Sequence, residues 1–278
     1  MNVVAVNAVK EKPNIFRRKV KQVRASVNSR ILRTGFLQPD DNNMIGCTIT
    51  IYLLILAGGA LSAVRKKLTI AGAGLGALIG CMIFYTAGLP GLSMLAAFFI
   101  MGVGATSLGE ASKQSLPKKE TGARNAAQVF ANGGLAAIMC ILSFQVEYIA
   151  GMLPLLIAAI FSSAAADTVS SETGNVFGKK HYNILNGKPG IKGANGVVSL
   201  EGTLSGLAAS GLIAWIYGLW YQSFNYTFYI ILAGTIGNLA DSLLGAILEN
   251  KGYLHNNAVN FLNTLAAAVT ISLLVYFF

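Results

Sequence analysis

Two aspartates lie within, or at the end of, apolar segments that are long enough to cross a lipid bilayer. Asp167 is followed by a threonine and Asp241 by a serine, and an alanine precedes each of them. A carboxylate inside a membrane costs about 3 kcal/mol or more unless it binds a cation, a basic group or water. These two acids therefore predict a polar site for transport or for chemistry near one surface of a membrane protein.

Asp167 begins the densest polar stretch that follows an apolar segment, residues 167–175, which also holds Glu172 and Gly174. On a helix, Asp167 and Glu172 point about 140° apart, so joint metal binding needs local unwinding, which Gly174 permits. Mg²⁺ is normally held by one or two carboxylates with phosphates and water. We therefore expect Asp167 and Glu172, together with Asp241, to bind Mg²⁺ and take part in catalysis. The alternative is a helix end rich in serine and threonine at the membrane surface.

A glycine-rich loop follows, in which residues 187–196 contain four glycines, one proline and two lysines. Consecutive turn-forming residues expose backbone N–H groups that bind anions, and neighbouring lysines add positive charge. The loop lacks the Gly-Lys-Ser/Thr of a Walker A motif. We expect Lys192 to act in catalysis, and we expect nucleotide phosphates to contact Lys188, Asn195, Gly196, Ser199, Glu201 and Thr203. The alternative is a simple connecting loop.

Arg124 precedes another apolar segment, in which two amides, Gln128 and Asn132, lie one helical turn apart. An arginine at a helix start can hold a phosphate with two hydrogen bonds, helped by the helix dipole. The alternative is that Arg124 only fixes the membrane topology, a role that would give the same sequence pattern. Amides in an apolar helix should face the bundle, so we expect Gln128, Asn132 and Ser242 to contact the substrate.

The elements that position these residues are apolar helices. The chain has 278 residues, of which 54% are hydrophobic and 12% are charged, against about 25% charged in soluble proteins. Eight segments approach the ~20 residues that a membrane-spanning helix needs: 44–64, 68–89, 92–108, 126–144, 149–166, 202–220, 227–248 and 258–278. Lipid cannot satisfy backbone amides, and no alternating pattern suggests a barrel. The sequence predicts an all-α polytopic membrane helix bundle with about eight spans, in a range of six to eight.

The formal net charge of +10 is divided between an N-terminal tail and the membrane loops, so it is no sign of nucleic-acid binding. Residues 1–39 carry nine lysines and arginines against one acid and lack the apolar core of a secretory signal. We expect residues 1–43 to be a basic tail that rests on anionic lipid or a transit peptide, and 44–278 to be the transmembrane domain. A transit peptide would place this multi-pass protein in a chloroplast membrane.

The loops after the first, third, fifth and seventh predicted spans hold all twelve remaining basic residues, and the loops between them hold none. Basic loops favour the cytoplasmic, stromal or matrix side. The four basic loops should therefore share one membrane face. The N-terminal tail should then lie on the opposite face, although its own positive charge favours the face of the basic loops. Nearly all acids beyond the tail gather at the same face as these basic loops. Carboxylates for a metal ion and cations for phosphate groups would therefore lie close together there.

Four ordered blocks, residues 124–134, 166–174, 193–203 and 239–246, carry a resemblance to a known family. At these blocks the chain resembles the transmembrane protein 19 family, also called domain of unknown function 92, which includes a plant phytyl-phosphate kinase. The resemblance runs from about residue 68 to the C-terminus. It implies phosphorylation of a prenyl monophosphate to the diphosphate, with CTP or another nucleotide as donor, in tocopherol and related prenyl-lipid metabolism. Residues 194–198 differ from the common family pattern, which leaves the nucleotide preference open.

We therefore expect a prenyl-phosphate kinase embedded in the lipid bilayer. Its substrates would be an isoprenoid phosphate lipid and a nucleoside triphosphate, and its cofactor would be Mg²⁺. One alternative is a transporter of a lipid phosphate or an ion, in which Asp167 and Asp241 mark two repeats. Another is transfer of a nucleotidyl group from CTP to a lipid phosphate, which needs much the same groups. The sequence does not fix the chain length of the lipid or the oligomeric state.

Overall fold

The computed structural model describes residues 41–108 and 122–278, and most of these residues are helical. The helices are α2 (Asp41–Val64), α3 (Ile70–Ser107), α5 (Ala126–Leu142), α6 (Glu147–Phe177), α7 (Leu200–Tyr221), α8 (Thr227–Leu244) and α9 (Asn256–Phe277). A 3₁₀ turn, η1 (Phe224–Tyr226), precedes α8, and a π-helical turn, η2 (Gly245–Glu249), follows it. Two short strands, β1 (Tyr182–Asn183) and β2 (Val197–Val198), pair antiparallel. The predicted all-α bundle is confirmed, and residues 1–40 of the predicted tail lie outside the described residues.

Helix α3 is a hairpin of two antiparallel arms rather than one long rod. A straight helix of its 38 residues would separate its ends by about 57 Å. Instead, Lys67 Nζ, just before the helix, donates to Ser107 Oγ at its end, over 2.9 Å. The reversal occurs at Gly88, whose φ of 64° is open to glycine but strained for other residues. Pro90 follows it at the start of the second arm, where its fixed φ and missing N–H suit a helix beginning.

Among the described residues, six helices are long and apolar enough to cross a membrane, and α5 is a shorter apolar helix of 17 residues. Because α3 has two arms, the described chain forms eight helical rods, one for each predicted apolar segment. The number of helices among the described residues falls within the predicted range of six to eight. The helix that includes the fifth predicted segment is longer than expected, because α6 continues to Phe177 instead of ending near residue 166.

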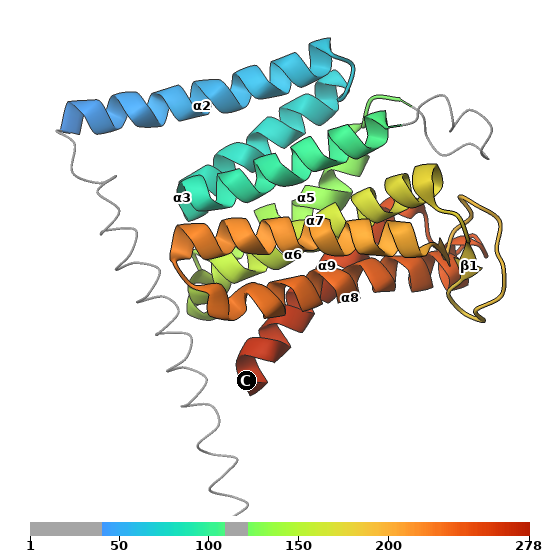
Figure 1. The fold of residues 1–278 in the computed structure, drawn as a ribbon. Coiled ribbons are helices and arrows are strands. Elements are labelled where there is room, and N and C mark those ends of the chain that lie inside the picture. The colour runs from blue at the N-terminus through green and yellow to red at the C-terminus, as the bar shows by residue number, and fades with distance from the viewer. Residues whose placement is uncertain (1–40, 109–121) are drawn as a thin grey trace, which may run out of the picture.

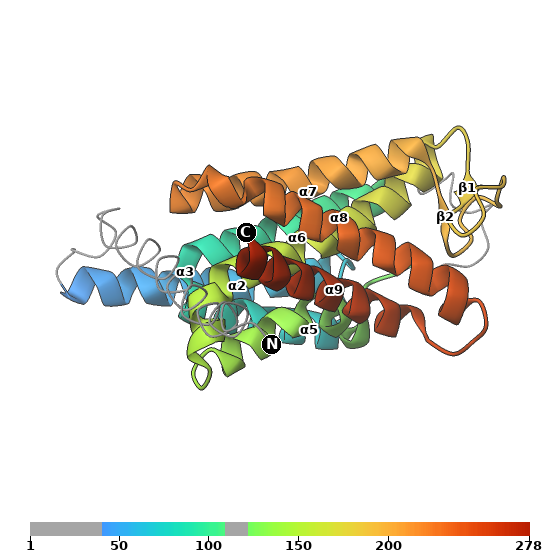
Figure 2. The same cartoon turned by 90° about the horizontal axis from the view of Figure 1, so that it is seen from below.

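Helix α6 is the central helix of the bundle (Figures 1 and 2) and contacts α3, α5, α7, α8 and α9. Every residue from Gly151 to Ala166 is buried. This segment is apolar or small on all sides, which is the composition of a helix surrounded by other helices. By contrast, α2 packs beside α3 at the edge of the bundle (Figure 1), and its leucines Leu53 and Leu54 are exposed. Asp167 therefore projects from the most enclosed helix of the molecule.

The described parts of the basic loops gather at one end of the bundle, the right-hand end in Figure 1. The Arg124 N–H donates to the Lys67 carbonyl, which joins the loop after α2 to the loop before α5. The Asn250 amide donates to the Asn195 carbonyl, which joins the loop after α8 to the glycine-rich loop. Hydrogen bonds thus tie together loops that are far apart in the sequence.

Candidate functional site

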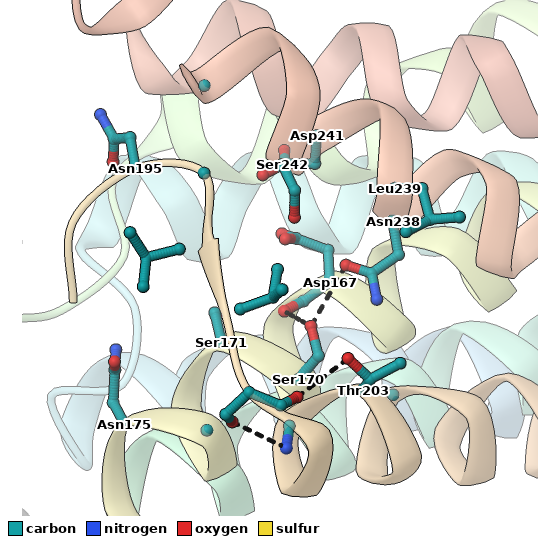
Figure 3. A pocket seen from close by; sticks show the side chains of 18 of the residues that line it. Asp167, Ser170, Ser171, Asn175, Asn195, Thr203, Asn238, Leu239, Asp241 and Ser242 are labelled. Atoms are coloured by element: carbon teal, nitrogen blue, oxygen red, sulfur yellow. Dashed lines mark hydrogen bonds between the residues drawn. The ribbon is translucent and has the colours of Figure 1, made fainter. Parts of the chain in front are cut away.

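A polar pocket opens at this end of the bundle, between α6, α7, α8, the loop of residues 193–199 and the start of α9 (Figure 3). Asp167 of α6 and Asp241 of α8 both line it, although 74 positions separate them in the sequence. In Figure 3, Asp167 points across the pocket toward Asp241 and Ser242. The cavity has a volume of about 90 Å³. This volume is large enough for a phosphate-sized group with water but too small for a whole nucleotide.

The polar stretch after Asp167 remains helical, which corrects the expectation that it unwinds. The helix satisfies its own hydroxyl groups: Ser171 Oγ donates to the Thr168 carbonyl, and Thr173 Oγ1 donates to the Val169 carbonyl. Glu172 keeps its position on the regular helix and does not line the pocket. Accordingly, the described residues contain no cluster of three or more His, Cys, Asp and Glu side chains placed to hold a metal. The predicted trio is reduced to the pair Asp167 and Asp241.

Glycines bring α7 against α6 directly below the pocket. A Cβ at Gly202 would lie 2.6 Å from the Ser170 carbonyl oxygen and 3.0 Å from the Gly174 Cα, so no larger residue fits. Gly174 thus serves close packing and not unwinding. Ser199 caps α7, since its Oγ accepts a hydrogen bond from the Gly202 N–H at 3.1 Å. The capping serine and Thr203 of the first turn also line the pocket.

The loop of residues 193–199 covers the pocket and docks on η2. Gly193 and Gly196 have positive φ values of 81° and 74°. A Cβ at Gly196 would overlap the Ala246 side chain and lie 3.0 Å from the Ser242 carbonyl oxygen. The π-helical turn widens the helix at this point, as shown by the hydrogen bond from the Asn250 N–H to the Gly245 carbonyl five residues back. Gly196 and Asn195 therefore line the pocket through a contact that only glycine permits.

Amides of α9 hold the carboxylate of Asp241. Asn263 Nδ2 donates to Asp241 Oδ1 at 3.2 Å. Asn260 Nδ2 donates to the same oxygen at 3.1 Å, in the amide orientation that satisfies both of its polar atoms. Ser163 Oγ of α6 donates to Asn263 Oδ1 at 2.8 Å, which turns the Nδ2 of that amide toward Asp241. Gly237 lets α8 approach these groups, because a Cβ there would overlap the Ser163 hydroxyl.

The three predicted phosphate-binding cations do not reach this pocket, and no lysine or arginine of the described chain lines it. Lys188 is exposed and Lys192 is half-buried in the loop. Arg124 anchors the end of α3, where its Nη2 donates to Thr106 Oγ1 at 3.2 Å and to the Gly102 carbonyl at 3.4 Å. Burial lowers the pKa of the Arg124 guanidinium, while the nearby carboxylates of Glu172 and Asp167 oppose that shift.

The remaining predicted residues are divided between two places. Ser242 lines the polar pocket, as expected of a substrate contact, but Glu201 does not and lies instead in the first turn of α7. Gln128 forms a reciprocal cap with Asn125 at the start of α5, and Asn132 Nδ2 donates to the Gln128 carbonyl. Both amides face a second cavity, together with Arg124.

Several polar residues of the site were not predicted from the sequence. These are Ser163, Ser170, His181, Thr235, Asn238, Asn256, Asn260 and Asn263. His181 Nε2 lies 3.1 Å from the Gly174 carbonyl, and Ser170 Oγ donates to Asn238 Oδ1 at 3.1 Å. A signal was present at the start of α9, where residues 256, 260 and 263 are asparagines on one helical face. Amides on one face of a membrane helix point into the bundle toward a partner.

The donor atoms of the pocket fit a hard cation such as Mg²⁺. The pocket is lined by three acids, Asp167, Asp241 and, at its edge on η2, Glu249, and by the hydroxyl of Ser242. All of these groups offer oxygen atoms, and Mg²⁺ is usually bound by one or two carboxylates with substrate phosphates and water. Because no lysine or arginine of the described residues lines the pocket, phosphate groups need a cation to offset the negative charge of these acids.

Comparison with known proteins identifies the family. The family model described as "Integral membrane protein DUF92" matches residues 53–268. An uncharacterized membrane protein of Synechocystis sp. is 34% identical over 80% of this chain and 87% of its own length. One of Methanocaldococcus jannaschii is 34% identical over 72% of this chain and 82% of its own.

No solved structure matches this chain significantly. Sequence similarity extends to a plant protein. The Arabidopsis thaliana relative, "Protein VTE6, chloroplastic", is 30% identical over 72% of this chain and 63% of its own length. The family match covers more than half of the chain and includes every residue that lines the polar pocket. This multi-pass membrane protein therefore belongs to the integral membrane protein DUF92 family.

Proposed function

We propose that this protein is a prenyl-phosphate kinase, which transfers the terminal phosphoryl group of a nucleoside triphosphate, with CTP the favoured donor, to a prenyl monophosphate. An oxygen of the acceptor phosphate forms a bond to the γ-phosphorus of the donor, and the bond from that phosphorus to the β–γ bridging oxygen breaks. The products are the lipid diphosphate and the nucleoside diphosphate. Phosphoryl transfer needs mainly alignment and charge stabilisation, so no strong general base is required.

The observation that carries the proposal is the composition and position of the polar pocket. Asp167 and Asp241 converge there from two helices, beneath a loop with two glycines of positive φ. The pocket is lined in part by the loop of residues 193–199, which lies at the end of the bundle where the basic loops gather (Figure 1). Water-soluble phosphates can reach such a site from solution, while the lipid acceptor stays in the bilayer.

Each group of the pocket has a role in this proposal. Asp167 and Asp241 would hold Mg²⁺, which supplies positive charge for the transferred phosphoryl group. Asn260 and Asn263 orient the Asp241 carboxylate through their hydrogen bonds. The loop of residues 193–196 would place backbone N–H groups near the donor phosphates and limit the access of water.

The resemblance to a family that includes a plant phytyl-phosphate kinase supports a prenyl phosphate as the acceptor. The 30% identity to a chloroplastic relative supports a role in the prenyl lipids of that compartment. Lys192 and Lys188 lie outside the pocket in the structure. The proposal therefore assigns charge neutralisation in the pocket to the metal ion.

The decisive experiment follows the two ends of the nucleotide separately. Purified protein in lipid nanodiscs is incubated with Mg²⁺, phytyl monophosphate and CTP that carries ³²P at either the γ or the α position. The kinase reaction predicts γ label in the lipid diphosphate and α label in CDP. Label from the α position in the lipid would instead establish nucleotidyl transfer.

Transport is tested with the same preparation reconstituted into sealed vesicles. Movement of phytyl monophosphate across the bilayer without any labelled lipid product would overturn the proposal in favour of a transporter. Asp167→Asn, which removes one pocket charge with almost no change in volume, provides the inactive control. We expect it to insert into membranes normally and to lose phosphorylation.

A further inference from the structure

A second cavity, of about 400 Å³, lies between α2, the two arms of α3 and α5. Its walls are almost entirely apolar and include Leu54, Ile55, Leu92, Leu95, Phe98 and Phe99. Glycines on α2, α3 and α5 leave the space between the helices open. Its size falls within the ~300–1,000 Å³ of small-molecule sites.

The only polar residues that line this cavity, among those the structure describes, are Ser62, Arg124, Gln128 and Asn132. Gln128 and Asn132 lie one turn apart on α5, and Arg124 immediately precedes the capping residue of this helix. Asn132 is only 8% exposed, and its Oδ1 has no hydrogen-bond partner among the described residues. Its orientation is fixed, because Nδ2 donates to the Gln128 carbonyl at 3.0 Å. A buried acceptor without a donor is costly, which favours a bound group that carries a hydroxyl or water.

The shape of the cavity suits one extended chain. Its lining on α2 runs from Ser62 to Ile51, which is about 16 Å along the helix. That length is roughly half of the ~30 Å hydrocarbon core. The Ser62 and Arg124 end lies at the same end of the bundle as the polar pocket, because Arg124 bonds to the loop after α2. The cavity therefore has an apolar interior and a cationic mouth at the membrane face.

Arg124 also connects this mouth to the polar pocket. It contacts α3 and lines the apolar cavity, while the Glu172 and Asp167 carboxylates lie within electrostatic reach of its guanidinium. Asp167 in turn lines the polar pocket. Helix α6 thus separates two compartments, one polar and one apolar, whose charged groups approach each other at Arg124.

We propose that this second cavity binds the hydrocarbon chain of a single-chain lipid monophosphate, with its phosphate at the Arg124 end. The inference rests on the proposed function, because it identifies the occupant as the acceptor of that reaction. Charge complementarity supports this occupant: the mouth carries a guanidinium and the amide groups of Gln128 and Asn132, whereas the rest is apolar. One elongated cavity accommodates a single chain better than the two chains of a bilayer phospholipid.

The test uses the whole protein in nanodiscs without any nucleotide, so it does not depend on catalysis. The probe is phytyl monophosphate with a photoreactive diazirine near the far end of its chain. After irradiation, mass spectrometry of peptides locates the adduct. We expect it on cavity-lining residues of α2 or α3, such as Leu54 or Leu92. An excess of unlabelled phytyl monophosphate should suppress it at least tenfold, and an equal excess of phosphatidylglycerol should not.

A matched pair of variants on α2 tests occupancy. Gly58 lines the cavity and Gly46 does not, and a Cβ at either position meets nothing within 4 Å. Gly58→Leu should fill the cavity and reduce the adduct at least tenfold, while Gly46→Leu should label like the native protein. If Gly58→Leu does not fold, as judged by size-exclusion chromatography, the adduct position in the native protein decides the question.

Two outcomes would overturn the inference. One is an adduct confined to residues outside the cavity, and the other is equal competition by phosphatidylglycerol, which would mark the cavity as a general lipid groove. Failure of the proposed function looks different. Specific labelling of the cavity without phosphorylation when CTP and Mg²⁺ are added would reject the kinase and retain the lipid site. Phosphorylation with an adduct elsewhere would reject only the lipid site.

Discussion

Asn263 on α9 donates a hydrogen bond to the Asp241 carboxylate on α8, and Ser163 on α6 fixes the orientation of that amide. Three helices therefore meet in one chain of hydrogen bonds below the polar pocket. Asn263 is completely buried, so its polar atoms depend on these partners. This arrangement orients Asp241 from the interior of the bundle, on the side away from the pocket mouth.

Replacement of Asn263 by leucine should therefore reduce phosphorylation by about 10- to 100-fold, the usual effect of losing a group that orients a metal ligand. The reduction should be accompanied by a higher Mg²⁺ concentration at half-maximal activity. Titration of activity with Mg²⁺ measures both quantities. Asn257→Leu, on the same helix but outside the pocket, is the control. An unchanged Mg²⁺ dependence in Asn263→Leu would show that this amide does not act through Asp241.

The glycine-rich loop offers a matched pair of substitutions. Gly196 and Gly187 have similar φ values of 74° and 67°, so alanine costs about 1 kcal/mol of backbone strain at either position. Only at Gly196 would the new Cβ overlap Ala246 on η2, because Gly187 has nothing within 4 Å. Gly196→Ala should lower activity more than tenfold, and Gly187→Ala should remain near the native rate. Equal losses in both variants would reject the docking of this loop on η2 as a functional contact.

Arg124 should contribute to stability independently of any role with the lipid. Its guanidinium donates to Gly102 and Thr106 on α3, and hydrogen bonds of charged groups each contribute about 1.5–3 kcal/mol. Arg124→Met should lower the melting temperature in detergent by several degrees. Lys188→Met removes the same charge at an exposed position and should leave the melting temperature unchanged. The thermal unfolding of both variants can be followed by circular dichroism, and equal melting temperatures would contradict the anchor role.

The span count and the two aspartates could be predicted because both depend on local patterns. Apolar length identifies membrane helices, and a carboxylate such as Asp167 within an apolar segment is costly without a partner. The two arms of α3 correspond to the separate predicted segments 68–89 and 92–108, and the chain reverses at Gly88, between the two arms. The spacing of Asp167 and Glu172 also showed that a regular helix points them apart.

The rest depends on tertiary contacts that no local pattern encodes. The sequence placed Arg124 with the phosphates because it precedes a helix, but its guanidinium donates to Gly102 and Thr106 on the second arm of α3. The sequence suggested that Gly174 permits unwinding, whereas Gly174 packs closely against Gly202 within the helical part of α6. Asn263 was overlooked because the last apolar segment lacks charge, and an uncharged amide is a weak signal until its partner is known.

The central claim is that Asp167 and Asp241 form one metal–phosphate site. Binding of Mn²⁺ in place of Mg²⁺, measured by electron paramagnetic resonance with nucleotide present, tests it most directly. The account predicts that Asp167→Asn and Asp241→Asn each weaken the Mn²⁺ affinity at least tenfold, while Glu172→Gln binds like the native protein. Native Mn²⁺ affinity in either aspartate variant would contradict it.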